Sequence, residues 1–315
     1  MMPQTLPTIT SAIAEITTIL GKSPIPMNPE AAASIGLIVL FSVIAINGIL
    51  LGIWGVRRLF LEKPTFQRHW SYLDLWLVPQ IIAHLFAVLL VPLMFLMPDA
   101  KNAGDMMANV GFILPMLFIQ NIVFFGVPTA FIRWKYQLPL RDIGLSPLPK
   151  RRDVLLGIGL GLAAIVVSLP LEYGLTALAK QFSYLPWVEA GLKMEQSLPI
   201  NALIESITKQ GVGVLILAAL AIGPGPGFGE EMLFRGFLFG LLKRRLGLWP
   251  GIIISGFVFA AVHGYFIGFL PVFLFGMALA ALYHKTGSLW TCIIVHATNN
   301  SVLVLMAFFF PSLSH

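Results

Sequence analysis

The last third of the sequence contains six polar side chains that together could hydrolyse an amide bond. They comprise two carboxylates, one guanidinium, two imidazoles and one carboxamide: Glu230, Glu231, Arg235, His263, His296 and Asn300. A carboxylate in low-dielectric surroundings can act as a general base near neutral pH and draw a proton from water. A nearby histidine can share that proton, and a second histidine with an asparagine amide can donate hydrogen bonds to an oxyanion. The residue types therefore supply a base, a proton partner and oxyanion donors.

The spacing of these residues places two pairs on shared helix faces. Glu231 and Arg235 are four residues apart, and so are His296 and Asn300. Residues four apart in a helix are neighbours on one face. We interpret Glu231 with Arg235 as an ion pair that holds its helix in register rather than as a second base. The alternative for Arg235 is that its side chain snorkels toward the membrane surface.

The composition indicates that membrane helices position these residues. Hydrophobic residues make up 57% of the 315 residues and charged residues only 11%, whereas a soluble domain carries about 25% charged residues. Several apolar runs reach the roughly 20 residues that a helix needs to cross a bilayer. The sequence therefore predicts an all-α, polytopic membrane helix bundle, with the plasma membrane as the expected location.

The basic residues indicate orientation rather than a nucleic-acid partner. The net charge is +6, and the basic residues form short runs at the ends of apolar segments, namely Arg57-Arg58, Lys150-Arg151-Arg152 and Lys243-Arg244-Arg245. Loops with such runs face the cytoplasm under the positive-inside rule. We therefore expect these loops to be cytoplasmic, the lipid bilayer to be a partner and nucleic acid not to be one.

Apolar segments and charged loops together predict about eight crossings with both termini outside. The segments are 33–56, 75–97, 108–132, 154–178, 203–243, 251–266, 268–284 and 289–310. Segment 203–243 must cross once to bring its basic end to the cytoplasm, although the run Gly223-Pro224-Gly225-Pro226-Gly227 interrupts it. A broken helix is tolerated only where its backbone lines a protein-buried or watery cavity. We therefore expect an intramembrane polar cavity beside Glu230.

The depths of the polar residues favour one site over scattered structural contacts. With a rise of about 1.5 Å per residue, Glu230 lies roughly 20 Å from the basic loop and His263 roughly 18 Å from the turn at Pro250. By the same rise, His296 and Asn300 lie roughly 12–18 Å from Ser288. A seam near 180–202 also divides the chain into an N-terminal segment with a four-span part, 1–202, and a second four-span part, 203–310.

Three motifs in this second part resemble those of the CPBP family, also called Abi. They are Glu230-Glu231-x-x-x-Arg235, Phe259-x-x-x-His263 and His296-x-x-x-Asn300. The family comprises type II CAAX prenyl endopeptidases and bacteriocin-processing or immunity proteins, and the resemblance covers roughly 203–305. It implies that 203–310 is a catalytic membrane domain in which Glu230 activates water with His263 as partner. It further implies that His296 and Asn300 form the oxyanion site, with Glu231 and Arg235 in support. The run before the first motif departs from the family pattern.

The resulting expectation is an intramembrane endopeptidase that cleaves a membrane-embedded or lipidated protein or peptide. The alternatives are a non-catalytic membrane immunity or scaffold protein, and a transporter with a broken helix.

We expect no metal, because the sequence contains no HExxH and each candidate ligand comes from a separate helix. The alternative is a zinc-dependent variant in which Glu230, His263 and His296 hold the ion and leave a fourth position for water. Cys292 lies four residues before His296, and we interpret it as a small apolar residue rather than as a nucleophile.

Overall fold

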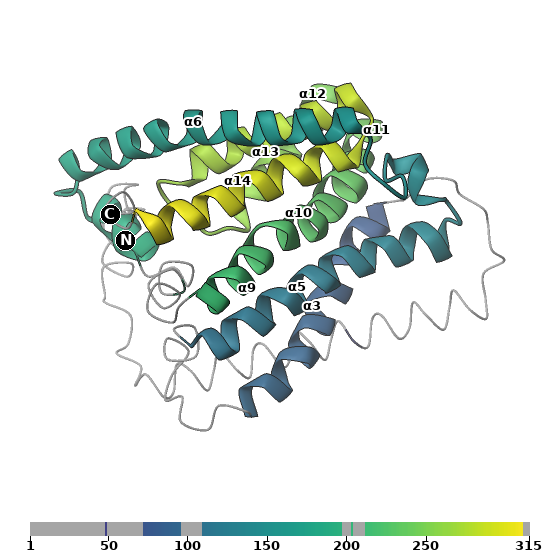
Figure 1. Cartoon of the computed structure of the whole chain (residues 1–315), viewed down its shortest axis with the longest axis horizontal. Coiled ribbons are helices and arrows are strands. Elements are labelled where there is room, and N and C mark those ends of the chain that lie inside the picture. The colour runs from purple at the N-terminus through teal and green to yellow at the C-terminus, as the bar shows by residue number, and fades with distance from the viewer. Residues whose placement is uncertain (1–47, 49–71, 96–108, 197–202, 204–211, 311–315) are drawn as a thin grey trace, which may run out of the picture. The chain divides into compact units, whose positions relative to one another are not determined.

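The computed structural model describes residues 48, 72–95, 109–196, 203 and 212–310. These residues contain helices and no strand, which confirms the all-α fold (Figure 1). The helices are α3 (Tyr72–Phe95), α5 (Val110–Ala130), η2 (Phe131–Lys135), η3 (Leu140–Ile143), α6 (Arg151–Gln181), α7 (Pro186–Gln196), α9 (Val212–Ile222), α10 (Pro224–Glu231), η4 (Met232–Phe239), α11 (Gly240–Leu246), α12 (Leu248–Ala261), α13 (Phe269–Thr286) and α14 (Leu289–Phe309).

The chain is a multi-pass membrane protein. Within the described residues, five helical stretches are long and apolar enough to cross a membrane: Val110–Lys135, Arg151–Gln181, Val212–Leu246, Phe269–Thr286 and Leu289–Phe309. They agree with five of the predicted segments, including the broken one. Segment 33–56 lies outside the described residues apart from Gly48. The total of about eight crossings therefore stays a prediction.

The predicted crossing at 251–266 differs from the structure. Helix α12 has only 14 residues and ends at Ala261, which is fewer than the roughly 20 residues that a span needs. Residues 262–264 form a turn instead. Gly264 adopts a φ of 71° there, a left-handed conformation that glycine permits and that does not continue a helix. His263 therefore lies in a turn and not on a regular helix.

Helices α6 and α14 lie side by side along their length (Figure 1). The buried residues of α6 recur every four positions and form one stripe: Asp153, Gly157, Gly161 and Ile165. A Cβ atom at Gly157 would lie 2.5 Å from Ile294 of α14, so only glycine permits this approach. Close packing through small residues is the usual basis of helix association in membranes. This contact holds α14, which carries His296, in place.

Helices from both sides of the predicted boundary at 202/203 pack together. Residues Pro64–His315 form one compact unit, in which α10 contacts α5 on one side and α14 on another. The functional division of the chain into 1–202 and 203–310 stays a prediction.

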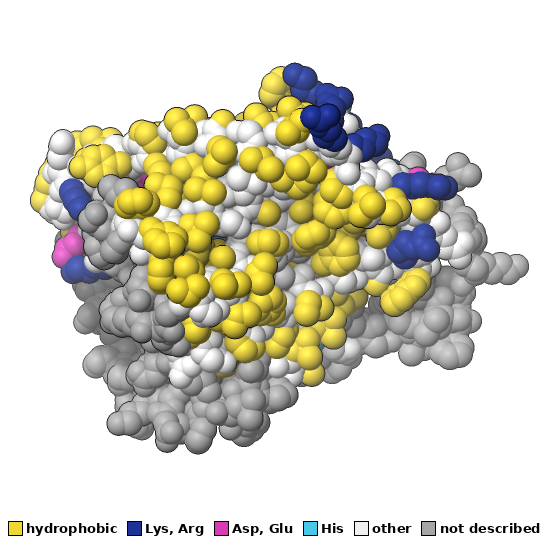
Figure 2. Space-filling model, viewed as in Figure 1, with side chains coloured by type: hydrophobic (Ala, Val, Ile, Leu, Met, Phe, Trp, Pro, Cys, Tyr) yellow, Lys and Arg dark blue, Asp and Glu magenta, His cyan; other side chains and the backbone are white. Residues whose placement is uncertain are grey.

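The described surface has the character expected of a membrane protein. Figure 2 shows a broad hydrophobic face, with most of the visible Lys and Arg side chains gathered where α6 begins and α11 ends. Exposed basic residues at these helix ends include Arg151, Arg152, Lys243, Arg244 and Arg245.

Candidate active site

The broken helix α9–α10 presents Glu230 and Glu231 to the other helices. Pro226 has no N–H group, so the Ile222 carbonyl loses its usual helical donor. Asn300 Nδ2 donates to that carbonyl oxygen at 3.0 Å. Asn121 Nδ2 of α5 donates to the adjacent Ala221 carbonyl oxygen at 3.1 Å. Two asparagines from different helices therefore donate to the last two carbonyls of α9.

Glycines let α10 pass closely between its two neighbours. A Cβ atom at Gly227 would lie 2.9 Å from the Ile293 carbonyl oxygen of α14, and one at Gly229 would lie 2.8 Å from the Asn121 carbonyl oxygen of α5. Positions two apart in a helix face nearly opposite directions, about 200° apart. The unusual glycine and proline run therefore brings the two carboxylates between α5 and α14.

A buried polar network surrounds Glu231, and we name its members, Glu231, Arg235 and His296, the buried network. Arg235 Nη1 donates to Glu231 Oε1 at 2.7 Å, and both side chains are fully buried. Arg235 Nη2 also donates to the Gly276 carbonyl oxygen at 3.2 Å. The predicted ion pair is therefore present, and Arg235 does not snorkel. It follows α10 directly in η4, a π-helix, a geometry that is frequent at functional sites.

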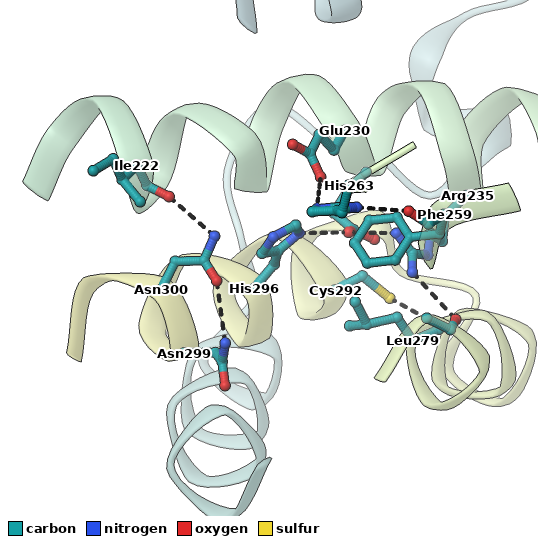
Figure 3. Close-up of polar contacts among 12 residues, drawn as sticks. Ile222, Glu230, Arg235, Phe259, His263, Leu279, Cys292, His296, Asn299 and Asn300 are labelled. Atoms are coloured by element: carbon teal, nitrogen blue, oxygen red, sulfur yellow. Dashed lines mark hydrogen bonds and ion pairs between the residues drawn. The ribbon is translucent and has the colours of Figure 1, made fainter. Parts of the chain in front are cut away.

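His296 joins the buried network through the same carboxylate oxygen. Its Nδ1 atom lies 2.8 Å from Glu231 Oε1. Because an ionised carboxylate only accepts hydrogen bonds, Nδ1 carries the proton and Nε2 is the nitrogen left to act on another group. The rings of Phe259 and Phe275 lie edge-on to the imidazole at 5.8 and 5.6 Å. His296 is thus fixed in both position and tautomer (Figure 3).

Glu230 and His263 form a second and looser group, which we name the open pair. His263 Nε2 lies 3.8 Å from Glu230 Oε2, and the two side chains are 24% and 10% exposed. That separation is too long for a hydrogen bond. His263 Nδ1 lies 2.6 Å from the Phe259 carbonyl oxygen, which can only accept, so Nδ1 donates and Nε2 faces the carboxylate. Glu230 Oε2 is buried and has no hydrogen-bond partner among the described residues.

The structure brings five of the six predicted residues into these two groups. Asn300 is on α14 one turn from His296, but its contacts are with Ile222 and with Asn299, whose Nδ2 donates to Asn300 Oδ1 at 3.1 Å (Figure 3). Asn121 links α5 to α9, and the sequence does not identify its partner, a carbonyl 100 residues away.

The three candidate zinc ligands, Glu230, His263 and His296, are not gathered into one group in the described structure. Across the described ranges, no three or more His, Cys, Asp and Glu side chains are grouped so that they could hold a metal ion. His296 Nδ1 is bonded to Glu231, and Glu230 is with His263 in the separate open pair. Cys292 is fully buried, and its Sγ donates to the Leu279 carbonyl oxygen at 3.5 Å, which agrees with a packing role.

Comparisons with known proteins agree with the predicted resemblance. Residues 212–302 match the family model described as Type II CAAX prenyl endopeptidase Rce1-like, and this segment contains all six predicted residues. A protein of Bacillus subtilis (strain 168) named "Putative membrane peptidase YdiL" is 30% identical over 97 residues. The alignment covers 31% of this chain and 38% of the relative. No solved structure gives a significant match.

Proposed function

We propose that this chain, similar over residues 212–302 to type II CAAX prenyl endopeptidases, is an intramembrane endopeptidase. It hydrolyses a peptide bond of a membrane-associated protein or peptide with water that Glu230 activates. The observation that carries the proposal is the open pair. Glu230 Oε2 is a buried carboxylate oxygen that no other group in the described part of the chain bonds, and it lies 3.8 Å from His263 Nε2.

The hydrogen-bonding capacities of the open pair suit a water molecule. In the neutral imidazole, Nε2 accepts because Nδ1 carries the proton, and the facing carboxylate oxygen also accepts. Two acceptors cannot bond each other, but a water that donates one hydrogen to each satisfies both. Burying a carboxylate oxygen without a partner is unfavourable, so the arrangement calls for a third group. A water molecule bound between the two side chains would lie beside Glu230, the residue proposed to take its proton.

The reaction then proceeds by direct attack. Glu230 takes a proton from the water as the oxygen forms a bond to the scissile carbonyl carbon, and the carbonyl π electrons move onto the carbonyl oxygen. When that oxyanion collapses, the C–N bond breaks and the departing nitrogen receives the proton from Glu230 or His263. The products are a carboxylate and an amine, and no covalent enzyme intermediate forms.

His296 and Asn300 are the proposed donors to the oxyanion. His296 is proposed to donate through Nε2, because Nδ1 already bonds the Glu231 carboxylate. Asn300 uses one Nδ2–H on Ile222 and keeps a second one. Donors fixed in advance are the effective ones, because no reorganisation is needed during the reaction.

The proposed chemistry needs no metal, and the substrate is proposed to be lipidated or embedded in the membrane. The site lies on helices of a membrane protein, so a substrate held in the bilayer reaches it directly. The basic loops are proposed to face the cytoplasm, in the plasma membrane. A prenylated peptide is the first probe because the matched family's name specifies prenyl substrates.

The test is hydrolysis by purified protein in nanodiscs. The probes are an S-farnesylated CAAX peptide and a set of N-acylated, internally quenched peptides. Wild type is expected to release a new C-terminal carboxylate, and Glu230→Gln to release none above background. Glu189→Gln is the control, because Glu189 is an exposed residue of α7 paired with Lys193.

Three results would contradict parts of the proposal. Cleavage by Glu230→Gln at the wild-type rate would exclude Glu230 as the base. A cellular phenotype that survives Glu230→Gln, with no membrane peptide changed in comparative proteomics, would favour a non-catalytic partner. Stoichiometric zinc in active protein, with activity lost on its removal, would replace the metal-free mechanism.

A further inference from the structure

His263 depends on a loop for its position. Helix α12 ends at Ala261, and the His263 N–H donates to the Ala260 carbonyl oxygen at 3.1 Å in a tight turn. Gly264 then reverses the chain at a φ of 71°. We name residues 262–268 the site loop. The bond from the Val262 N–H to the Val258 carbonyl oxygen and the contact of His263 Nδ1 with the Phe259 carbonyl oxygen tie the first end of the loop to α12. The position of the imidazole therefore depends on α12 and also on whatever fixes the rest of the site loop.

Tyr265 connects the site loop to the open pair. Its ring stacks on the His263 imidazole, the histidine of that pair, at 5.9 Å with an interplanar angle of 22°. A displacement of the site loop would therefore move the ring against which His263 rests.

Helix α7 holds the other end of the site loop through Glu195. Glu195 Oε2 accepts from the Ile267 N–H at 2.5 Å, and Oε1 accepts from the Gly268 N–H at 2.9 Å. Hydrogen bonds to an ionised group are shorter and stronger than neutral ones. This carboxylate thus joins α7 to two consecutive amides at the start of α13.

Apolar contacts bring α7 and the site loop together beside this anchor. The edge of the Trp187 ring meets Phe266 with centroids 6.3 Å apart. A Cβ atom at Gly191 would lie 2.5 Å from the Phe266 ring, so α7 approaches the loop as closely as its backbone allows. Val188 is buried on the same helix. The contact is therefore packed as well as hydrogen-bonded.

We propose that Glu195 is a positioning residue for the reaction: it fixes the site loop so that His263 Nε2 faces Glu230 Oε2. The inference rests on the proposed hydrolase function, and Glu195 itself acts through the loop and not on the substrate. Sequence motifs give no sign of it, because Glu195 lies outside the segment 212–302 that matches the family model.

The substitution Glu195→Gln tests this role with little change of volume. A glutamine can accept at only one of the two oxygen positions, and its NH₂ group would face a backbone N–H. Glu189→Gln is the matched control, because Glu189 lies on the same helix, is 53% exposed and pairs only with Lys193 among the contacts shown. Glu195→Asp, one methylene shorter, serves as the conservative variant.

Two measurements on full-length protein in nanodiscs follow. The first is kcat and KM for the S-farnesylated CAAX peptide. We expect Glu195→Gln to lower kcat by about 10- to 100-fold with KM within about twofold, because small misplacements of reacting groups reduce rate strongly. The second is amide hydrogen exchange over 265–268, which we expect to accelerate about tenfold as the loop opens locally. Glu189→Gln should change neither, and Glu195→Asp should restore part of kcat.

Each contrary outcome overturns the proposal. Unchanged exchange over 265–268 would show that Glu195 does not anchor the loop. Faster exchange with an unchanged kcat would show that the anchor does not position His263, and a change confined to KM would indicate substrate contact instead. If the wild-type protein cleaves no probe, the proposed function fails on its own. The hydrogen-exchange measurement over 265–268 still decides whether Glu195 holds the site loop. Helical content by circular dichroism identifies any variant that fails to fold, and Glu195→Asp then replaces it in both measurements.

Discussion

The two histidines of the site occupy contrasting environments. His296 lies within α14, is 2% exposed and bonds a fully buried carboxylate that also pairs with Arg235. His263 lies in a turn beyond α12, has a side chain that is 24% exposed and faces its carboxylate across 3.8 Å. Side-chain hydrogen bonds hold the buried network together, although Glu231 Oε2 and Arg235 Nε have no partner among the described residues, whereas the two facing atoms of the partly exposed open pair do not bond each other. The difference separates the residues that hold the site from those that meet water.

The largest effect should come from the base of the open pair. Glu230→Gln keeps the size of the side chain but removes its ability to take a proton. We expect kcat to fall by about 10²- to 10⁴-fold, the usual contribution of a positioned general base, with the thermal midpoint little changed. Peptide cleavage and thermal unfolding in nanodiscs measure the two. A folded Glu230→Gln protein with full activity would show that the open pair does not supply the base.

Removing the cation of the buried network should instead reduce stability. Arg235→Ala leaves Glu231 buried without its ion pair, and losing one partner of such a pair costs about 3–5 kcal/mol. We expect activity to fall only in proportion to the fraction of folded protein, so that the activity of each folded molecule is unchanged. Denaturant unfolding followed by Trp fluorescence measures the loss. A fully stable but inactive Arg235→Ala protein would place Arg235 among the reacting groups instead.

The two asparagines at the helix break sharpen the comparison. Asn121→Ala and Asn300→Ala each remove a side-chain donor from a carbonyl at the end of α9, one buried and one partly buried, at a cost of up to about 1–3 kcal/mol. If Asn300 also donates to the oxyanion, only Asn300→Ala should lower kcat beyond the loss of stability. Parallel measurements of unfolding and kcat separate these effects. Equal kcat values in the two variants would remove Asn300 from the oxyanion site.

The smallest effect should follow substitution of the single cysteine. Cys292 is buried and bonds only a backbone carbonyl among the contacts shown, so Cys292→Ala should destabilise by about 1 kcal/mol and keep wild-type kcat. Denaturant unfolding and peptide cleavage in nanodiscs measure the two quantities. Loss of cleavage in a folded Cys292→Ala protein would reopen the thiol mechanism.

Local spacing predicted the parts of the site that depend on one helix. The ion pair between Glu231 and Arg235 follows from residues four apart, and the break in 203–243 follows from its prolines. The bond from His296 to Glu231 joins residues 65 apart. Helical spacing identifies neighbours within one helix and does not identify a partner on another helix. The same is true of Asn121 at Ala221 and of Glu195 at the site loop. The end of α12 was placed too late because a glycine at positive φ, and not apolarity, decides it.

Direct attack by water activated at Glu230 is the central claim, and a single turnover in H₂¹⁸O tests it most directly. Excess enzyme in nanodiscs cleaves the S-farnesylated CAAX peptide, and mass spectrometry then locates the isotope. The account predicts one ¹⁸O atom in the new carboxylate of the product and none in the enzyme peptide that contains Glu230. Label in Glu230, with unlabelled product, would show that the carboxylate attacks the substrate itself and would contradict the account.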